Sequence, residues 1–128
     1  MKKLIILLVF IPLVSFGQEI DVDFALQNMA QEINKKCPMV INKDTRLNNV
    51  AILSNKTVRY NYTLVNLNVD KIDADLLKKE SATILNNDVK TNTGLKILRS
   101  YNVTFSYYYT DKYGKFIFEH KVTPSIYN

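Results

Sequence analysis

Residues 102–123 of this chain read NVTFSYYYTDKYGKFIFEHKVT, and this stretch decides the fold. Apolar and polar side chains alternate in it on both sides of the turn sequence Asp111–Gly114, a pattern that predicts a β-hairpin. Alternation sends one set of side chains toward a core and the other toward solvent, so a register error of one residue would exchange the two sets. The inward set is Phe105, Tyr107, Phe116 and Phe118, and the outward set is Ser106, Tyr108, Ile117 and Glu119.

A second hairpin is predicted upstream, where residues 57–65 alternate in the same way and residues 45–53 supply a partner strand across a short polar turn. A helix is predicted at 21–36, because its apolar residues recur every three or four positions. Another is predicted to begin at the cap residue Asp73 and to end near residue 89. The order helix, hairpin, helix, hairpin predicts an α+β fold, with an antiparallel sheet of about four strands and two helices packed on one face.

The N-terminus has the layout of a secretory signal. Lys2 and Lys3 precede an apolar block at 4–14, and small residues follow at 15–17. The block is shorter than the roughly 20 residues that a membrane-spanning helix needs. We therefore expect a signal peptide at 1–17 and one α+β domain at 18–128. No cysteine stands at the cleavage region to carry a lipid, so the expected product is soluble, without a membrane span, in the periplasm or outside the cell.

Charge and cysteine content exclude several classes of protein. The net charge of +5 falls to +3 when Lys2 and Lys3 leave with the signal peptide, which is too little for a nucleic-acid-binding domain. Cys37 is the only cysteine, so no internal disulfide forms. A lone cysteine of this kind is typically buried and inert, and the alternatives are an intermolecular bridge or a reactive thiol.

Several short motifs carry a resemblance to a known group of proteins. They are Lys36–Val40, Asp44–Leu47, Tyr60–Leu64, the Val122–Pro124 end of the closing hairpin and the Phe-Gly-Gln ending of the signal sequence. In these the chain resembles a family of small exported bacterial proteins from Bacteroidota. The resemblance implies a single exported domain and brings no activity, substrate or site residue with it.

The residues offer little material for catalysis. His120 is the only histidine, and a dyad with Cys37 would need both groups to meet beside an orienting acid, for which no flanking motif exists. One histidine and one cysteine do not supply a zinc site, and no glycine-rich phosphate loop is present. We therefore predict no catalytic residues, no metal and no cofactor.

Three residues are candidates for ligand binding. Tyr108 is predicted to point outward among small polar side chains, where a tyrosine binds a peptide or a sugar ring or forms an ordinary cross-strand pair. Arg46 and Arg59 lie on neighbouring predicted strands, where they either bind a carboxylate or phosphate or remain solvated charges.

These observations favour a non-enzymatic binding or interaction module whose partner is a protein, peptide or glycan of the cell envelope. One alternative is an inhibitor or immunity-type partner of another exported enzyme, which an apolar outward patch would favour. Another is a small hydrolase or thiol enzyme that uses Cys37 and His120. A concave groove lined by tyrosines would favour the binding module.

Overall fold

The structure is a computed structural model that describes residues 21–128. The predicted signal peptide at 1–17 lies outside the described residues. Within the described range, every helix is too short or too polar to cross a membrane.

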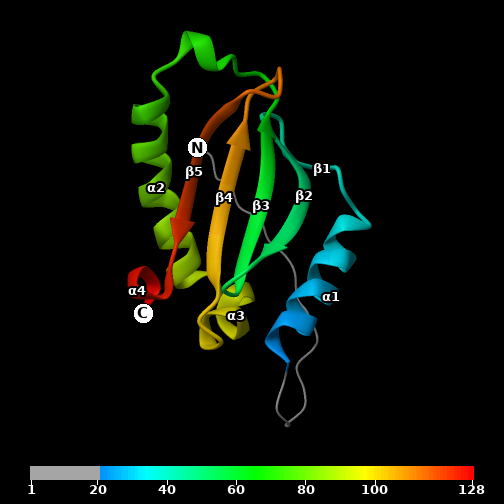
Figure 1. The fold of residues 1–128 in the computed structure, drawn as a ribbon. Coiled ribbons are helices and arrows are strands. Elements are labelled where there is room, and N and C mark those ends of the chain that lie inside the picture. Colours follow the sequence, from blue (N-terminus) through cyan, green and yellow to red (C-terminus); the bar gives the residue numbers. More distant parts are fainter. Residues whose placement is uncertain (1–20) are drawn as a thin grey trace.

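The described chain forms the following elements, shown in Figure 1: α1 (Val22–Asn34), β1 (Met39–Asn42), β2 (Thr45–Leu53), β3 (Thr57–Leu64), η1 (Val69–Lys71), α2 (Ala74–Thr91), η2 (Thr93–Leu95), α3 (Lys96–Ser100), β4 (Thr104–Thr110), β5 (Phe116–Val122) and α4 (Pro124–Tyr127). The strands make one five-stranded sheet in the order β1-β2-β3-β4-β5. Aspartates begin the long helices, since Asp21 and Asp73 each accept a hydrogen bond from a backbone N–H of the first turn.

The predicted α+β class, with a mainly antiparallel sheet, is confirmed, and both expected hairpins form as β2–β3 and β4–β5. The sheet differs from the prediction in two respects. A short fifth strand, β1, pairs with the start of β2, and the two hairpins join through a parallel pairing of β3 with β4. Parallel neighbours need a long crossover connection, and the segment with α2 and α3 provides it.

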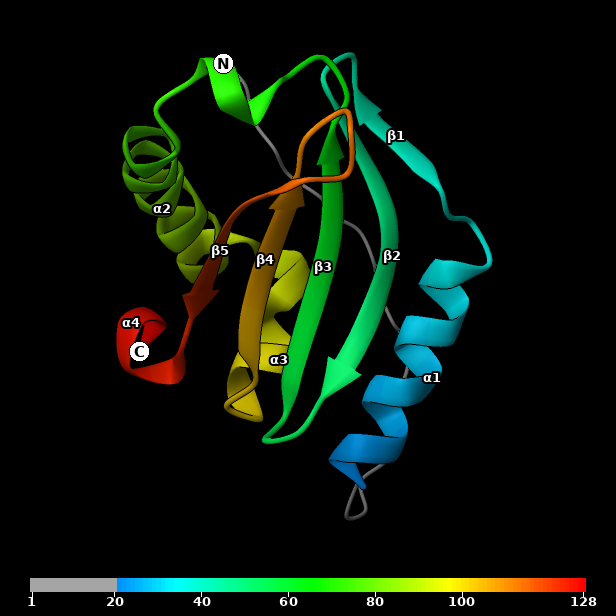
Figure 2. The ribbon, with the colours of Figure 1, turned by 45° about the horizontal axis from the view of Figure 1, so that its top comes forward.

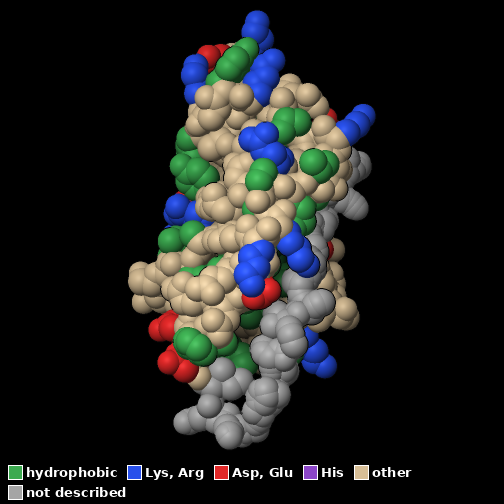
Figure 3. All heavy atoms as spheres, turned by 90° about the vertical axis from the view of Figure 1, so that its right-hand side faces the viewer, with side chains coloured by type: hydrophobic (Ala, Val, Ile, Leu, Met, Phe, Trp, Pro, Cys, Tyr) green, Lys and Arg blue, Asp and Glu red, His purple; other side chains and the backbone are tan. Residues whose placement is uncertain are grey.

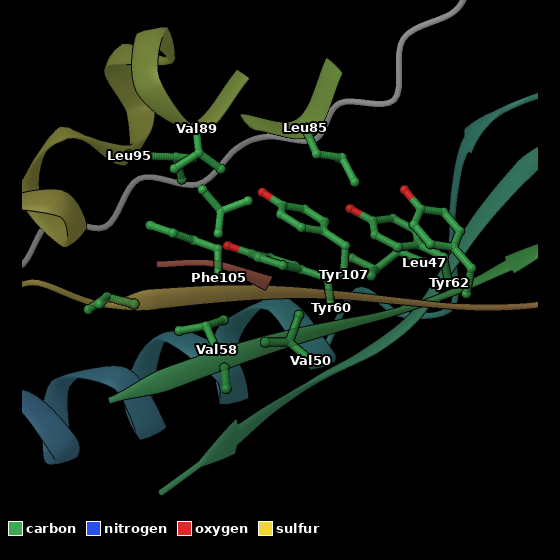
Figure 4. Packing of buried hydrophobic residues seen from close by; sticks show 14 of the residues in the cluster. Leu47, Val50, Val58, Tyr60, Tyr62, Leu85, Val89, Leu95, Phe105 and Tyr107 are labelled. Carbon is green, nitrogen blue, oxygen red and sulfur yellow. The ribbon is translucent and has the colours of Figure 1, made fainter. Parts of the chain in front are cut away.

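The core lies on the face of the sheet that carries the helices. α1 packs along the β2 side and α2 along the β5 side, as Figures 1 and 2 show. Between them the rings of Tyr60, Tyr62 and Tyr107 project from the central strands toward the side on which Leu85 and Val89 of α2 lie (Figure 4). Tyr107 was predicted to point inward, and the structure confirms it.

The turn between β4 and β5 is fastened to the connection that follows β3. Gly114 has a φ of 81°, a backbone conformation that side-chain-bearing residues rarely adopt. The carboxylate of buried Asp111 accepts backbone hydrogen bonds from Val69 (2.9 Å), Tyr113 (2.8 Å) and Lys115 (2.9 Å). Burial alone would raise the pKa of Asp111, but these hydrogen bonds outweigh it and lower the pKa.

The closing hairpin corrects one predicted pair of orientations. Phe116 was expected inward and Ile117 outward, yet Phe116 is 53% exposed and Ile117 only 5%. The pairing register shifts between Tyr109 and Thr110, which face Phe118 and Phe116 respectively, so Ile117 is an extra residue in β5. Such a β-bulge reverses the alternation for the residues before it. Phe105, Tyr107 and Phe118 remain inward as predicted.

α1 protects the part of β2 that β1 does not reach. Asn34, the last residue of α1, accepts a hydrogen bond from the N–H of Val50 (2.7 Å) and donates one to its carbonyl (2.9 Å). A neighbouring strand would otherwise make these two bonds. One side-chain amide therefore continues the ladder of β1 and closes an exposed edge.

We expect Asn34→Ala to lower the free energy of unfolding by about 1–3 kcal/mol, because both polar groups of Val50 lose their partner. Urea unfolding at neutral pH measures the change. Asn28→Ala, an exposed asparagine in the same helix, is the control and should change stability by less than about 0.5 kcal/mol. Equal effects of the two substitutions would contradict the role given to Asn34.

Two phenylalanines of β5 test the bulge. Phe118 is 4% exposed and stacks on Tyr109, so Phe118→Ala should cost about 3–5 kcal/mol. Phe116→Ala should cost less than about 1 kcal/mol, because about half of that residue's surface already lies in solvent. Thermal unfolding of both variants side by side decides between the observed register and an uninterrupted alternation, which predicts similar losses.

Candidate functional site

The face of the sheet opposite the helices carries the candidate site. In Figures 1 and 2 the sheet stands in front of α2 and α3, so this face is turned toward the viewer. We call it the open face and define it by the strand register. Its residues are Val40 of β1, Arg46, Asn49, Ala51 and Leu53 of β2, Thr57, Arg59, Asn61 and Thr63 of β3, Thr104, Ser106, Tyr108 and Thr110 of β4, and Phe116, Glu119 and Lys121 of β5.

An aromatic pair stands on the open face near the β5 edge. The rings of Tyr108 and Phe116 have centroids 5.1 Å apart and are inclined at 49°. The guanidinium carbon of Arg59 lies 4.8 Å from the centre of the Tyr108 ring, a cation–π contact. Tyr108 is thus held on two sides, while Phe116 keeps about half of its surface in solvent.

An ion pair fixes Arg59 over the ring of Tyr108. Its Nη2 lies 3.2 Å from Oε2 of Glu119, and both side chains are more than two-thirds buried. The same carboxylate oxygen accepts a hydrogen bond of 2.5 Å from Ser106, which is fully buried. Burial opposes ionisation of Glu119, but the hydrogen bond from Ser106 and the charges of Arg59 and Lys121 lower its pKa. The group is a charged, rigid support for the ring of Tyr108.

Arg46 occupies a separate position on the open face. Its Nε donates to Oδ1 of Asn48 (2.9 Å), and the amide of Asn48 donates to Thr63 (2.8 Å). Thr63 in turn lies 3.3 Å from the hydroxyl of Thr110, which donates to the carbonyl of Tyr62. A line of side-chain hydrogen bonds therefore runs from Arg46 across β3 to β4.

Two of the three predicted binding residues come together. Tyr108 and Arg59 are in contact, whereas Arg46 pairs with Thr63, four residues from Arg59 along β3. Four strand residues span about 13 Å, so the two arginines do not form one cationic spot.

Sequence reasoning missed Phe116, Ser106 and Glu119 as members of the site. Ser106 and Glu119 were correctly placed outward by alternation. The bond of Glu119 to Arg59, however, joins residues 60 positions apart, and Ser106 enters the site by donating to the same carboxylate. Phe116 was assigned to the core, because no residue type in β5 signals the bulge.

The structure separates Cys37 from His120. Cys37 lies two residues before the start of β1, and His120 lies in β5, at the opposite edge of the sheet. Four strand spacings of about 4.8 Å put them on the order of 19 Å apart, so they form no dyad. Nε2 of His120 instead lies 2.8 Å from Oδ1 of Asn86 in α2, and burial lowers the His120 pKa. Cys37 packs partly buried against the core, which raises the pKa of its thiol.

The fold and the open face define a small α+β domain with helices on one side of its sheet and a polar, aromatic-edged surface on the other. The chain belongs to the family described as a domain of unknown function, DUF8479, whose model matches residues 22–118.

Two solved structures share the fold. One is a Pseudomonas aeruginosa protein provisionally described as secreted, with a TM-score of 0.64 and 16% identity, covering 87% of this chain and 100% of its own. The other is the pilotin EpsS of the Vibrio vulnificus type 2 secretion system, with a TM-score of 0.61 and 13% identity, covering 84% of this chain and 92% of its own. A comparison with curated proteins gives no match.

The lowered pKa of Glu119 predicts a pH dependence of stability. Because the pKa in the folded protein lies below the ordinary value of 4.5, the ionised Glu119 stabilises the fold above that pH, through the hydrogen bond from Ser106 and the ion pair with Arg59. This contribution disappears as the pH falls through the folded-state pKa. We expect the stability difference between the protein and Glu119→Gln to be largest at pH 7 and to shrink below about pH 4.5, as urea unfolding at pH 7, 5 and 3.5 would measure.

Glu80→Gln is the matched control, since it removes the same charge from an exposed position on α2. Its stability difference should stay near zero at all three pH values. A Glu119→Gln difference that does not vary with pH would show that the ion pair with Arg59 does not stabilise the fold.

Proposed function

We propose that this chain is an exported, non-enzymatic partner-binding module and that its open face is the contact surface. The observation that carries the proposal is the cluster of Tyr108, Phe116 and Arg59 on a sheet face that no helix of residues 21–128 covers. Tyrosine and arginine dominate the energetics of protein interfaces, and aromatic residues are enriched in their centres.

The cluster is also held in place before any partner binds. Glu119 orients Arg59, Arg59 lies over the ring of Tyr108, and Phe116 packs beside it. A surface whose side chains are already ordered loses less conformational entropy on association, which favours binding.

Export of the chain is part of the proposal. It rests on the lysine pair and the apolar block of residues 2–14, and it is consistent with the two proteins of similar fold. The Vibrio vulnificus neighbour belongs to a secretion system, which favours a protein as the partner.

The alternatives receive less support. A continuous apolar patch on the open face would favour an inhibitor or immunity-type partner. The exposed apolar residues Val40 and Phe116 instead lie at opposite edges of this face. Arg46, Thr63 and Thr110 lie between them. A thiol enzyme would need Cys37 and His120 to approach each other.

Site-specific photo-crosslinking tests the contact surface. A benzophenone amino acid replaces Tyr108 in the full-length chain, expressed in its native host, and crosslinked proteins are identified by mass spectrometry. The control places the same probe at Phe24, an exposed aromatic position on α1. We expect one protein to crosslink through position 108 and not through position 24. Crosslinks from position 24 alone would contradict the proposal.

Once the partner has been identified by crosslinking, Tyr108→Ala should weaken its binding to this protein at least about tenfold, while the melting temperature changes little. Calorimetric titration of the purified pair measures the affinity. Phe24→Ala should leave the affinity unchanged. A Tyr108→Ala variant that binds as tightly as the parent protein would exclude the open face as the contact surface.

A further inference from the structure

Arg46 is a residue of the open face whose charge no acid among residues 21–128 pairs. Arg59 is paired with Glu119, and Lys121 acts on the same carboxylate. Among residues 21–128, no Asp or Glu lies within ion-pair distance of Arg46, whose side chain is exposed. The local charge of this part of the face therefore favours an anionic group from outside the chain.

The guanidinium of Arg46 is oriented for such a group. Asn48 holds the Nε, and Asn48 is itself held by Thr63. Within the described residues no hydrogen bond reaches the two Nη atoms, so the Nη end of the guanidinium is available to a ligand. Two parallel Nη–H donors match the two oxygens of a carboxylate.

The charges on this side of the molecule are dispersed. Figure 3 shows Lys and Arg side chains in separate groups with uncharged surface between them, on the side that carries α1 and β1. A polyanion would need a continuous basic band, whereas a single carboxylate needs one guanidinium. On the open face itself the cations are Arg46, Arg59 and Lys121, and Arg59 is paired with Glu119, so Arg46 suits the single carboxylate of an acidic side chain.

The register places Arg46 in line with the exposed aromatic ring. Val40, Arg46, Thr63, Thr110 and Phe116 are successive partners across the five strands. The backbone positions of Arg46 and Phe116 are three strand spacings apart, or about 14 Å. An extended segment covers this distance in about four residues, and residues i and i+4 of such a segment point to the same side.

We propose that Arg46 binds the carboxylate of an acidic residue in an extended segment of the partner protein, and that an aromatic residue four positions away in that segment packs on Phe116. The segment crosses the strands over the hydroxyls of Thr63 and Thr110. This inference rests on the proposed function and names the chemistry of the partner.

The test uses a synthetic peptide, acetyl-Gly-Glu-Thr-Ser-Thr-Phe-Gly-amide, and two variants of it. One variant has Gln in place of Glu, and the other moves Phe one position closer to Glu, so that the two side chains point to opposite sides. Titration into the ¹⁵N-labelled protein is followed by NMR, including the Nε–H signal of Arg46. We expect saturable shifts at Arg46, Thr63, Thr110 and Phe116, and at least about fivefold weaker binding of each variant peptide.

Substitutions in the protein complete the test. Arg46→Gln should abolish the preference for Glu over Gln, whereas Lys121→Gln, which removes the same charge from the same face, should retain it. Equal binding of the Glu and Gln peptides through Tyr108 and Phe116 would overturn the carboxylate site and leave the proposed function standing. Shifts confined to the helical face would overturn both. Inorganic phosphate that shifts the Arg46 signal at lower concentration than the peptide does would overturn the assignment to a carboxylate.

Discussion

The parallel pairing of β3 with β4 is the constraint on which the rest of this structure depends. Two hairpins alone would leave two small sheets, whereas the pairing of residues 57–63 with 104–110 fuses them into one. Because the strands run in the same direction, the chain has to return from one end of the sheet to the other between them. The returning segment forms α2 and α3, which lie on the helical face, so that no helix of residues 21–128 covers the other face. The open face is thus a consequence of the topology.

The same pairing stacks the tyrosines of the core. Tyr60 faces Tyr107, and Tyr62 faces Tyr109, with ring centroids 5.3 and 5.0 Å apart. Burial raises the pKa of all four phenols, and the negative charge of Asp88 on α2 raises it further, so the rings stay neutral at physiological pH. Stacked neutral rings contribute packing and area burial at the centre of the sheet, where the fold is held together.

Alternation predicted much of this arrangement because side-chain direction in a strand is a local property. It sent Phe105 and Tyr107 inward and Tyr108 outward, and the structure agrees. It went wrong at Phe116, since a bulge is decided by how β4 and β5 fit together and by no residue type within β5. The parallel join, the pair of Arg59 with Glu119 and the bond of Asn34 to Val50 each link distant parts of the chain. Such contacts depend on tertiary packing, which local periodicity does not encode.

The hydrogen bonding of the open face bears on where its binding energy can come from. Asn48, Thr63 and Thr110 bond to one another, and Asn61 donates to Asn49 (2.7 Å), so these polar groups already have partners. A ligand that competed for them would exchange one hydrogen bond for another with little net gain. In the proposed complex, affinity would come from groups that change their surroundings on binding. These are the half-exposed ring of Phe116, which would lose contact with water, and the Nη end of the Arg46 guanidinium, which no hydrogen bond from residues 21–128 reaches. In the proposed complex the satisfied network between them is the spacer, so the separation of these two groups, and not their chemistry alone, would select the partner.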